Sequence, residues 1–214
     1  MLGIEIFNLF FTKKALLYIY MEILGKILGS PARVKIMRLF LLNPKGKFSR
    51  KDIIKKSRVS PNTASQEIKL LASIGFIKKH SNILWSFNPL FKYTGEFDSL
   101  LVGAETLDKK TIADNFRKVG RVKLLLVSGI FIKNKDTRVD LLVVGDKMKK
   151  AKIEEEIRKL EAEIGTELVY AIFDTKDFIY RLNMYDKLVR DVLDFPHEVI
   201  FQARELSTQA LKKA

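Results

Sequence analysis

The sequence predicts an α+β protein built from two parts: a helical part that ends in a strand hairpin, and a small α/β part around a mixed sheet. Three observations predict this architecture. Apolar residues recur at helical spacing up to about residue 74. Short strand-like runs then alternate with helical segments in the remainder. Hydrophobic residues make up 47% of the 214 residues, which is enough to build real cores and excludes a mainly disordered chain.

Positive charge is concentrated in one block of the chain. The net charge is +14, and residues 21–90 hold 14 Lys and Arg against 3 Asp and Glu, whereas residues 91–214 hold 23 against 21. The basic block therefore suggests a polyanionic partner. The same contrast gives the expected organisation: an uncertain extension over 1–20, a basic domain over 21–90, a second domain over 91–204 and a tail over 205–214.

Composition excludes several classes of chemistry. There is no cysteine, so disulfides, thiolate zinc sites, iron–sulfur clusters and cysteine nucleophiles are excluded, and two histidines do not make a multi-histidine metal site. We expect no metal and no cofactor. The apolar run over 4–20 is too polar and too short for a membrane span, so we expect no membrane partner. Residues 1–20 are either an extra amphipathic helix or a mis-assigned start.

Two helices are expected at the start of the basic block. Ser30, followed by proline, predicts the beginning of a helix over 31–42. Ser49 and Asp52 have the spacing of a capping box, with Asp in the reciprocal place. This box opens a short helix over 50–56.

A third helix and a hairpin complete the block. Ser60 precedes a proline and caps a helix that runs to about Ser73 and stops at Gly75. Its expected apolar face comprises Ala64, Ile68, Leu71 and Ile74. Residues 76–79 and 84–87 read as two short strands joined by a polar turn. Three helices followed by a hairpin, with a short turn between the second and third helices, form a winged helix-turn-helix.

The same residues carry a resemblance to a known family. The resemblance is carried by the segments GSPARVKIMRLFLLNP and FSRKDIIKKSRVSPNTASQEIKLLASIGFIKK. Over residues 24–88, the chain resembles the winged-helix domain of small prokaryotic transcriptional regulators of the ArsR type. The resemblance implies double-stranded DNA as the partner. Helix-turn-helix proteins usually bind two half-sites as dimers, so we expect a homodimer. Regulators of this type often sense metals through Cys or His, and metal sensing is not carried over to this chain.

The candidate DNA contacts lie on the third helix and on the basic segments around it. Base-reading candidates are the polar residues off the apolar face: Asn62, Thr63, Ser65, Gln66 and Lys69, with Ser60 at the helix start. Phosphate contacts are expected from Arg50, Lys51 and Arg58, with Lys55 and Lys56 as further candidates. Lys78, Lys79 and His80 at the hairpin turn are expected to reach phosphate or the minor groove. The alternative is an ordinary solvated surface. Glu67 faces the wrong way for phosphates and is expected to pair internally.

The second part is expected to alternate strands and helices. The strands are expected over 123–127, 138–144, 168–173 and 198–201, the last at a sheet edge. The helices are expected over 97–102, 107–118, 150–164, 176–182 and 186–193, with a frayed helical tail over 203–213. Thr175 is the expected cap of its helix, and the apolar run over 138–144 predicts burial on both faces. Aromatic residues expected in the core are Phe173, Phe178, Tyr180, Tyr185 and Phe195.

Over about residues 105–201, the expected order is a strand, a Gly turn, a strand with an inward Asp, a helix and a strand. This order resembles the minimal nucleotidyltransferase domain of the DNA polymerase beta superfamily. That family has a Gly-Ser turn and an Asp-x-Asp strand, whose two carboxylates share one face and hold two Mg²⁺ ions. Here Ile130 follows Gly129, Arg138 stands at the first carboxylate position and Asp140 at the second. The third-strand carboxylate is absent as well. We expect a structural Arg138–Asp140 ion pair and an inactive domain.

The expected function is therefore a cytoplasmic, sequence-specific regulator of transcription that binds double-stranded DNA. Its second domain is expected to serve assembly or signal input from an unknown small-molecule or protein effector. One alternative is an active Mg-dependent nucleotidyltransferase that modifies a protein or RNA. A third class is a protein-interaction module, because winged helices also bind proteins.

Overall fold

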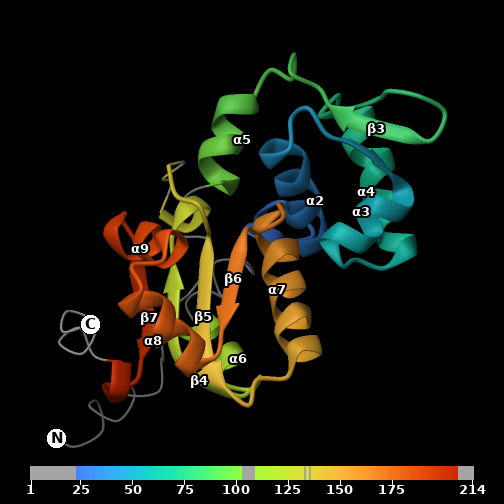
Figure 1. Cartoon of the computed structure of the whole chain (residues 1–214). Helices are drawn as coiled ribbons and strands as arrows, with labels where there is room; N and C mark the ends of the chain where they lie inside the picture. The colour runs from blue at the N-terminus through green and yellow to red at the C-terminus, as the bar shows by residue number, and fades with distance from the viewer. Residues whose placement is uncertain (1–22, 103–108, 133, 135, 207–214) are drawn as a thin grey trace, which may run out of the picture. The chain divides into compact units, whose positions relative to one another are not determined.

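The computed structural model describes residues 23–102, 109–132, 134 and 136–206. In these ranges the chain is α+β, as predicted, with a three-stranded antiparallel sheet and a four-stranded mixed sheet (Figure 1). The chain divides into two compact units, one of Met1–Asp108 with Arg158–Glu167 and one of Lys109–Ile157 with Leu168–Ala214. The expected extension over 1–20 and the tail beyond residue 206 lie outside the described residues.

Three helices of the first unit begin where the sequence predicts. They are α2 (Pro31–Leu42), α3 (Arg50–Ser57) and α4 (Pro61–Ser73). The capping box before α3 is complete, since the Asp52 amide donates to Ser49 Oγ and the Ser49 amide donates to Asp52 Oδ2. The predicted apolar face of α4 is buried except for Ile74, which is 52% exposed. Ile74 lies at the C-cap, beyond the helical turns that pack inward, so its inclusion was wrong.

The first unit also contains a small antiparallel sheet. It comprises β1 (Lys47–Ser49), β2 (Ile77–Lys79) and β3 (Leu84–Phe87) in the order β1-β3-β2. The sequence predicts the hairpin of β2 and β3 but not β1, because three residues between a turn and a helix give no recognisable alternation. In β1 the buried Phe48 lies opposite Trp85. The sheet therefore closes one side of the core formed by α2, α3 and α4.

Two later segments complete this unit. Helix α5 (Thr94–Leu101) adds Leu101 to the core, and the last part of α7 (Lys150–Ile164), far along the chain, belongs to the same unit. The buried Arg38 of α2 donates from Nε to the Leu101 carbonyl at 2.7 Å and from Nη1 to the Glu163 carbonyl at 3.0 Å. Because Arg38 binds both segments, the first unit extends past the expected boundary at residue 90.

The second unit is built on the mixed sheet. Its strands are β4 (Arg121–Val127), β5 (Leu141–Asp146), β6 (Tyr170–Phe173) and β7 (Glu198–Gln202), in the order β6-β5-β4-β7. Only β5 and β6 are parallel, and β7 lies at an edge, as predicted. Leu142 and Val144 face a core that includes α8, while Leu125 and Val143 on the opposite face are also fully buried. The prediction of burial on both faces of β5 is thus confirmed.

Helices and short 3₁₀ turns surround this sheet. They are α6 (Lys109–Phe116), η1 (Gly129–Ile132), the first part of α7, α8 (Thr175–Asn183), α9 (Lys187–Asp194) and η2 (Arg204–Leu206), the described part of the expected helical tail. Figure 1 shows α8 and α9 together on one side of the sheet. None of the helices in the described ranges combines the length and apolarity needed to cross a bilayer.

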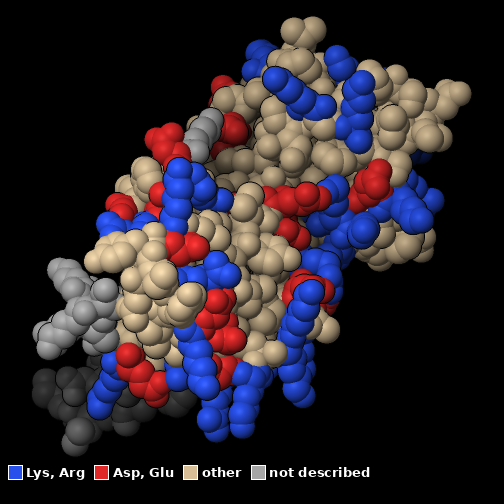
Figure 2. Space-filling view, in the orientation of Figure 1, with Lys and Arg blue, Asp and Glu red and all other residues tan. Residues whose placement is uncertain are grey.

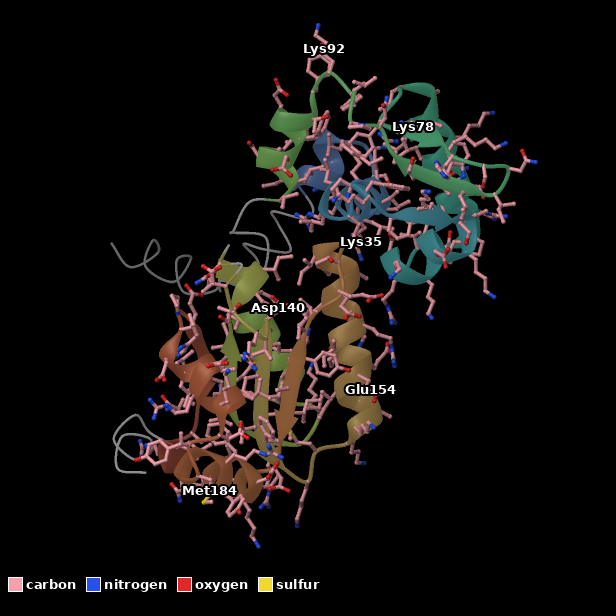
Figure 3. The ribbon with its side chains drawn as sticks, turned by 45° about the horizontal axis from the view of Figure 1, so that its top comes forward. Lys35, Lys78, Lys92, Asp140, Glu154 and Met184 are labelled. Atoms are coloured by element: carbon pink, nitrogen blue, oxygen red, sulfur yellow. The ribbon has the colours of Figure 1, made fainter. Side chains whose placement is uncertain are left out.

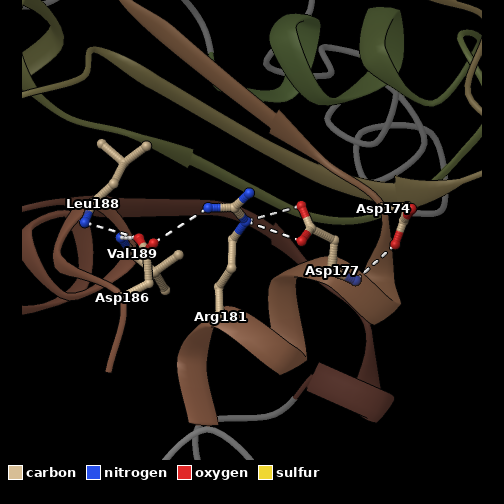
Figure 4. Close-up of polar contacts among 6 residues, drawn as sticks. All are labelled: Asp174, Asp177, Arg181, Asp186, Leu188 and Val189. Carbon is tan, nitrogen blue, oxygen red and sulfur yellow. Dashed lines mark hydrogen bonds and ion pairs between the residues drawn. The ribbon is translucent and has the colours of Figure 1, made fainter. Parts of the chain in front are cut away.

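An ion-pair network joins α8 to α9 (Figure 4). Arg181 Nε contacts both oxygens of Asp177 at 3.0 Å, and Nη1 contacts Asp186 Oδ2 at 3.2 Å. Asp186 also caps α9. The cap of α8 is Asp174, which accepts from the Asp177 amide at 2.8 Å, so the expected cap at Thr175 is wrong by one residue.

The aromatic residues of the second unit are divided between core and surface. Phe178 is fully buried, but Tyr180, Tyr185 and Phe195 are 64%, 68% and 42% exposed. The expectation that all five lie in the core is therefore wrong for these three. Aromatic composition predicts a core, but not which residues face it.

Candidate nucleic-acid interface

The connection between α3 and α4 is three residues long. Arg58 adopts a left-handed conformation, with φ of 51°, and its amide donates to the Ile54 carbonyl. Ser60 then caps α4. Below α4, Arg33 Nε donates to Glu67 Oε2 at 2.7 Å, which confirms the expected internal pairing of Glu67. These contacts fix which side of α4 faces outward.

A polar stripe runs along the outward side of α4. Asn62, Gln66 and Lys69 are exposed and are spaced by four and three residues, so they lie on one face. The residues that α4 buries are Ala64, Glu67, Ile68 and Leu71, on the opposite side. In the described part of the chain, the three stripe side chains make no hydrogen bond or ion pair. Their amide and ammonium groups are therefore available to a ligand.

Three other predicted contact residues form hydrogen bonds within the first turn of α4. Ser60 Oγ accepts from the Thr63 amide at 3.2 Å and shares a hydrogen bond of 2.7 Å with Thr63 Oγ1. Ser65 Oγ donates to the Pro61 carbonyl at 2.9 Å. The structure thus gives Ser60, Thr63 and Ser65 a local role at the start of α4, which the sequence analysis did not anticipate for the last two.

Basic side chains flank the stripe. Lys51 and Arg58 are exposed on α3 and its cap, and Arg50 Nη2 donates to the Pro61 carbonyl at 3.0 Å, which ties the start of α3 to the start of α4. Figure 2 shows blue side chains gathered over the region that Figure 1 labels α3. Lys56 differs, because its Nζ pairs with Glu167 Oε1 at 2.6 Å.

The hairpin contributes a second exposed group. Lys78, labelled in Figure 3, is exposed together with Lys79 and His80. The amide of His80 donates to the Leu84 carbonyl at 2.8 Å and closes the hairpin turn. Ile83, 71% exposed, shares this turn. The charge pattern does not predict Ile83, since an apolar side chain gives no electrostatic signal.

One carboxyl group at this surface has a shifted pKa. The hydroxyl and amide of Ser49 donate to Asp52, and these hydrogen bonds lower the pKa of the Asp52 carboxyl from its ordinary value of 3.8. Lys56 and Lys55 act in the same direction. Asp52 thus stays ionised at the start of α3, where its negative charge also interacts favourably with the positive end of the helix dipole.

The motif residues of the second unit have structural partners. Asp140, labelled in Figure 3, precedes β5, and its two oxygens accept from the amides of Ile130 and Val169, each at 2.9 Å. Arg138 pairs with Asp191 at 2.5 Å, so the expected Arg138–Asp140 ion pair is wrong. Asp140 is instead held by backbone donors. A side chain at Gly129, where φ is 53°, would collide with Asp140.

Comparisons with protein-family models, with curated proteins and with solved structures find no match to this chain. The function is therefore inferred from the chemistry of the surface itself.

Proposed function

We propose that the first unit is a winged helix-turn-helix domain and that the protein is a sequence-specific, double-stranded-DNA-binding regulator of transcription. The observation that carries this proposal is the outward stripe of Asn62, Gln66 and Lys69 on α4, flanked by exposed cations on α3 and on the hairpin. Polar residues at one helix face, with basic residues on both sides, fit an α-helix placed in a major groove.

The side-chain types indicate which residues contact bases and which contact phosphates. Asn62 and Gln66 present both a donor and an acceptor, the pattern that pairs with the adenine edge. Lys51, Lys78 and Lys79 are point charges suited to phosphate oxygens, which give affinity without sequence information. Base reading is thus assigned to α4, and positioning on the duplex to α3 and the hairpin.

For the second unit we propose a nucleotidyltransferase-like domain without catalytic activity, which serves assembly or signal input. Support comes from Asp140, whose two oxygens already accept backbone hydrogen bonds, and from Arg138 at the first carboxylate position. The expected assembly is a homodimer in the cytoplasm on two half-sites. Magnesium-dependent label transfer from an α-labelled nucleoside triphosphate would instead favour an enzyme.

The test is fluorescence anisotropy of the full chain with a duplex from its own upstream region and with a scrambled duplex, over a series of salt concentrations. The proposal predicts at least about tenfold preference for the upstream duplex and a steep salt dependence. The double variant Asn62→Ala/Gln66→Ala should lose that preference while it keeps the salt dependence. Equal binding to both duplexes that disappears near about 0.2 M salt would contradict a sequence-specific regulator.

A further inference from the structure

A cleft of about 410 Å³ opens in the first unit beside α3, and none of its lining residues belongs to α4. Its walls are the ends of α2 and α3 and residues 158–167, and all of its lining residues belong to this unit. The volume is in the range of small-molecule sites. The sequence gives no signal for it, since the cleft exists only because residues 158–167 return to α3.

Positive charge predominates in the lining. The charged residues are Lys55, Lys56, Arg58 and Arg158 against Glu161 and Glu167. Lys56 and Glu167 form an ion pair of 2.6 Å, which lowers the pKa of the Glu167 carboxyl, and Lys55 acts in the same direction. Glu167 is thus a carboxylate at neutral pH, and the lining retains an excess of two positive charges.

Helix dipoles oppose an anion here, because α2, α3 and α7 all end near the cleft and present carbonyl groups. Donors of the protein itself satisfy three carbonyl groups at the ends of α2 and α7. Asn43 Nδ2 donates to the carbonyls of Leu39 and Gly165, at 2.7 and 2.8 Å. Arg38 donates to the carbonyl of Glu163 at 3.0 Å. These three carbonyl groups are therefore not left open to a ligand, and the net charge of the lining side chains is positive.

We propose that this cleft binds a small phosphate monoester. Such a group carries about 1.5 to 2 negative charges at neutral pH, which matches the excess positive charge of the lining. Lys55 supplies an exposed ammonium group for the phosphate, and Arg58 and Arg158 add positive charge to the wall of the cleft. The hydroxyl of Thr166, also in the lining, donates to Asn43 Oδ1 at 3.5 Å, so its oxygen can still accept a hydrogen bond from the organic part of the molecule.

A regulatory consequence rests on the proposed DNA-binding function. Arg58 lines the cleft and also belongs to the basic surface beside α4. A bound phosphate monoester offsets the positive charge of Arg58 and so reduces the attraction of this surface for the phosphates of a duplex. Occupancy of the cleft should therefore weaken DNA binding.

Isothermal titration calorimetry of the full chain tests the site, with glucose 6-phosphate as the probe and glucose as its neutral counterpart. We expect one glucose 6-phosphate per chain, no binding of glucose, and at least tenfold weaker binding by Lys55→Gln/Arg158→Gln. Lys92→Gln, an exposed cation of the same unit outside the cleft, should bind as the unchanged protein does. No saturable heat up to about 5 mM, a concentration above the usual KM range of about 1 μM to 1 mM, would overturn the proposal. An equal loss of binding in Lys92→Gln would overturn it as well.

Two further measurements keep the outcome clear. Circular dichroism checks that each variant is folded, and Lys55→Gln alone, an exposed change on α3, replaces the double variant if that one unfolds. Anisotropy with the upstream duplex should then show at least about tenfold weaker binding at saturating glucose 6-phosphate. If no duplex binds at all, the DNA-binding proposal fails, while calorimetry still decides whether the cleft takes a phosphate monoester.

Discussion

Arg33 and Glu67 join α2 to the inner side of α4 through a hydrogen-bonded ion pair of 2.7 Å between Nε and Oε2. Glu67 is the only acidic residue in α4, and its side chain is 8% exposed. The pair therefore removes negative charge from the outward face, where Asn62, Gln66 and Lys69 lie. A carboxylate on that face would repel a nucleic-acid backbone.

Replacing Glu67 by Ala should destabilise the first unit by about 1–3 kcal/mol, because the guanidinium of Arg33 would be left half-buried without its partner. Urea unfolding followed by the fluorescence of Trp85, the single tryptophan, measures this loss. Lys69→Ala, on the exposed side of the same helix, should change stability by less than about 0.5 kcal/mol. Equal effects of the two substitutions would show that the ion pair contributes nothing.

Gln66→Ala should relax base preference at one position of the bound site by about 1–3 kcal/mol, since the side chain supplies a donor and an acceptor to one base. Competition with duplexes substituted at each position in turn locates that position. A uniform loss on every duplex would remove Gln66 from the base-reading set.

Lys51→Ala should weaken binding to all duplexes alike and reduce the slope of log affinity against log salt by about one, because one phosphate contact is lost. Anisotropy at several salt concentrations gives the slope. Lys176→Ala, an exposed lysine of the second unit, is the matched control and should leave it unchanged. An unaltered slope in Lys51→Ala would mean that this lysine faces solvent in the complex.

Asp52→Asn should cost about 1 kcal/mol of stability at pH 7, because a charged acceptor of the capping box becomes neutral. The pKa of Asp52 is lowered in the folded protein, so its contribution is complete above its ordinary value of 3.8 and is lost as pH falls below that value. The unfolding free energies of the unchanged protein and of Asp52→Asn should therefore converge as the pH falls below 3.8. A difference that stays constant with pH would contradict the assigned cause.

Gly165→Ala should destabilise the first unit by about 3 kcal/mol. Gly165 has a φ of 97°, and an added Cβ would lie 2.7 Å from the backbone of Arg38 and of Leu39. Gly95→Ala is the matched control, since nothing lies within 4 Å of its added Cβ and the residue is helical. The control should be neutral or up to about 1 kcal/mol more stable. Similar stabilities of the two variants would show that α7 does not pack closely on α2.

Local patterns predicted the helices of the first unit well. Ser30, Ser49 and Ser60 each precede a helix, and a cap acts through hydrogen bonds within three residues, which the sequence displays directly. The same logic failed at α8, where Asp174 and Thr175 are both capping types and only the backbone conformation decides between them.

Features that depend on distant parts of the chain were not predicted. Asp140 is held by amides of Ile130 and Val169, one on each side of it along the chain, and no spacing rule anticipates such an arrangement. The exposure of Tyr180 follows from which face of α8 meets the sheet, which composition does not specify. In the candidate interface, the sequence identified the stripe on α4 but not the hydroxyl contacts that occupy Thr63 and Ser65.

The buried Arg38 has a consequence for biosynthesis. Its acceptor on Glu163 lies 125 positions further along the chain. A ribosome releases α2 long before it releases that carbonyl, and domains complete their folding only when all of their segments have emerged. Throughout that interval, the apolar side of α2 can already pack on α3, α4 and the small sheet, but Arg38 Nη1 lacks the Glu163 carbonyl as its acceptor. A polypeptide truncated before residue 158 would keep Arg38 without this acceptor, so its first unit should be less stable and a preferred target of proteolytic quality control.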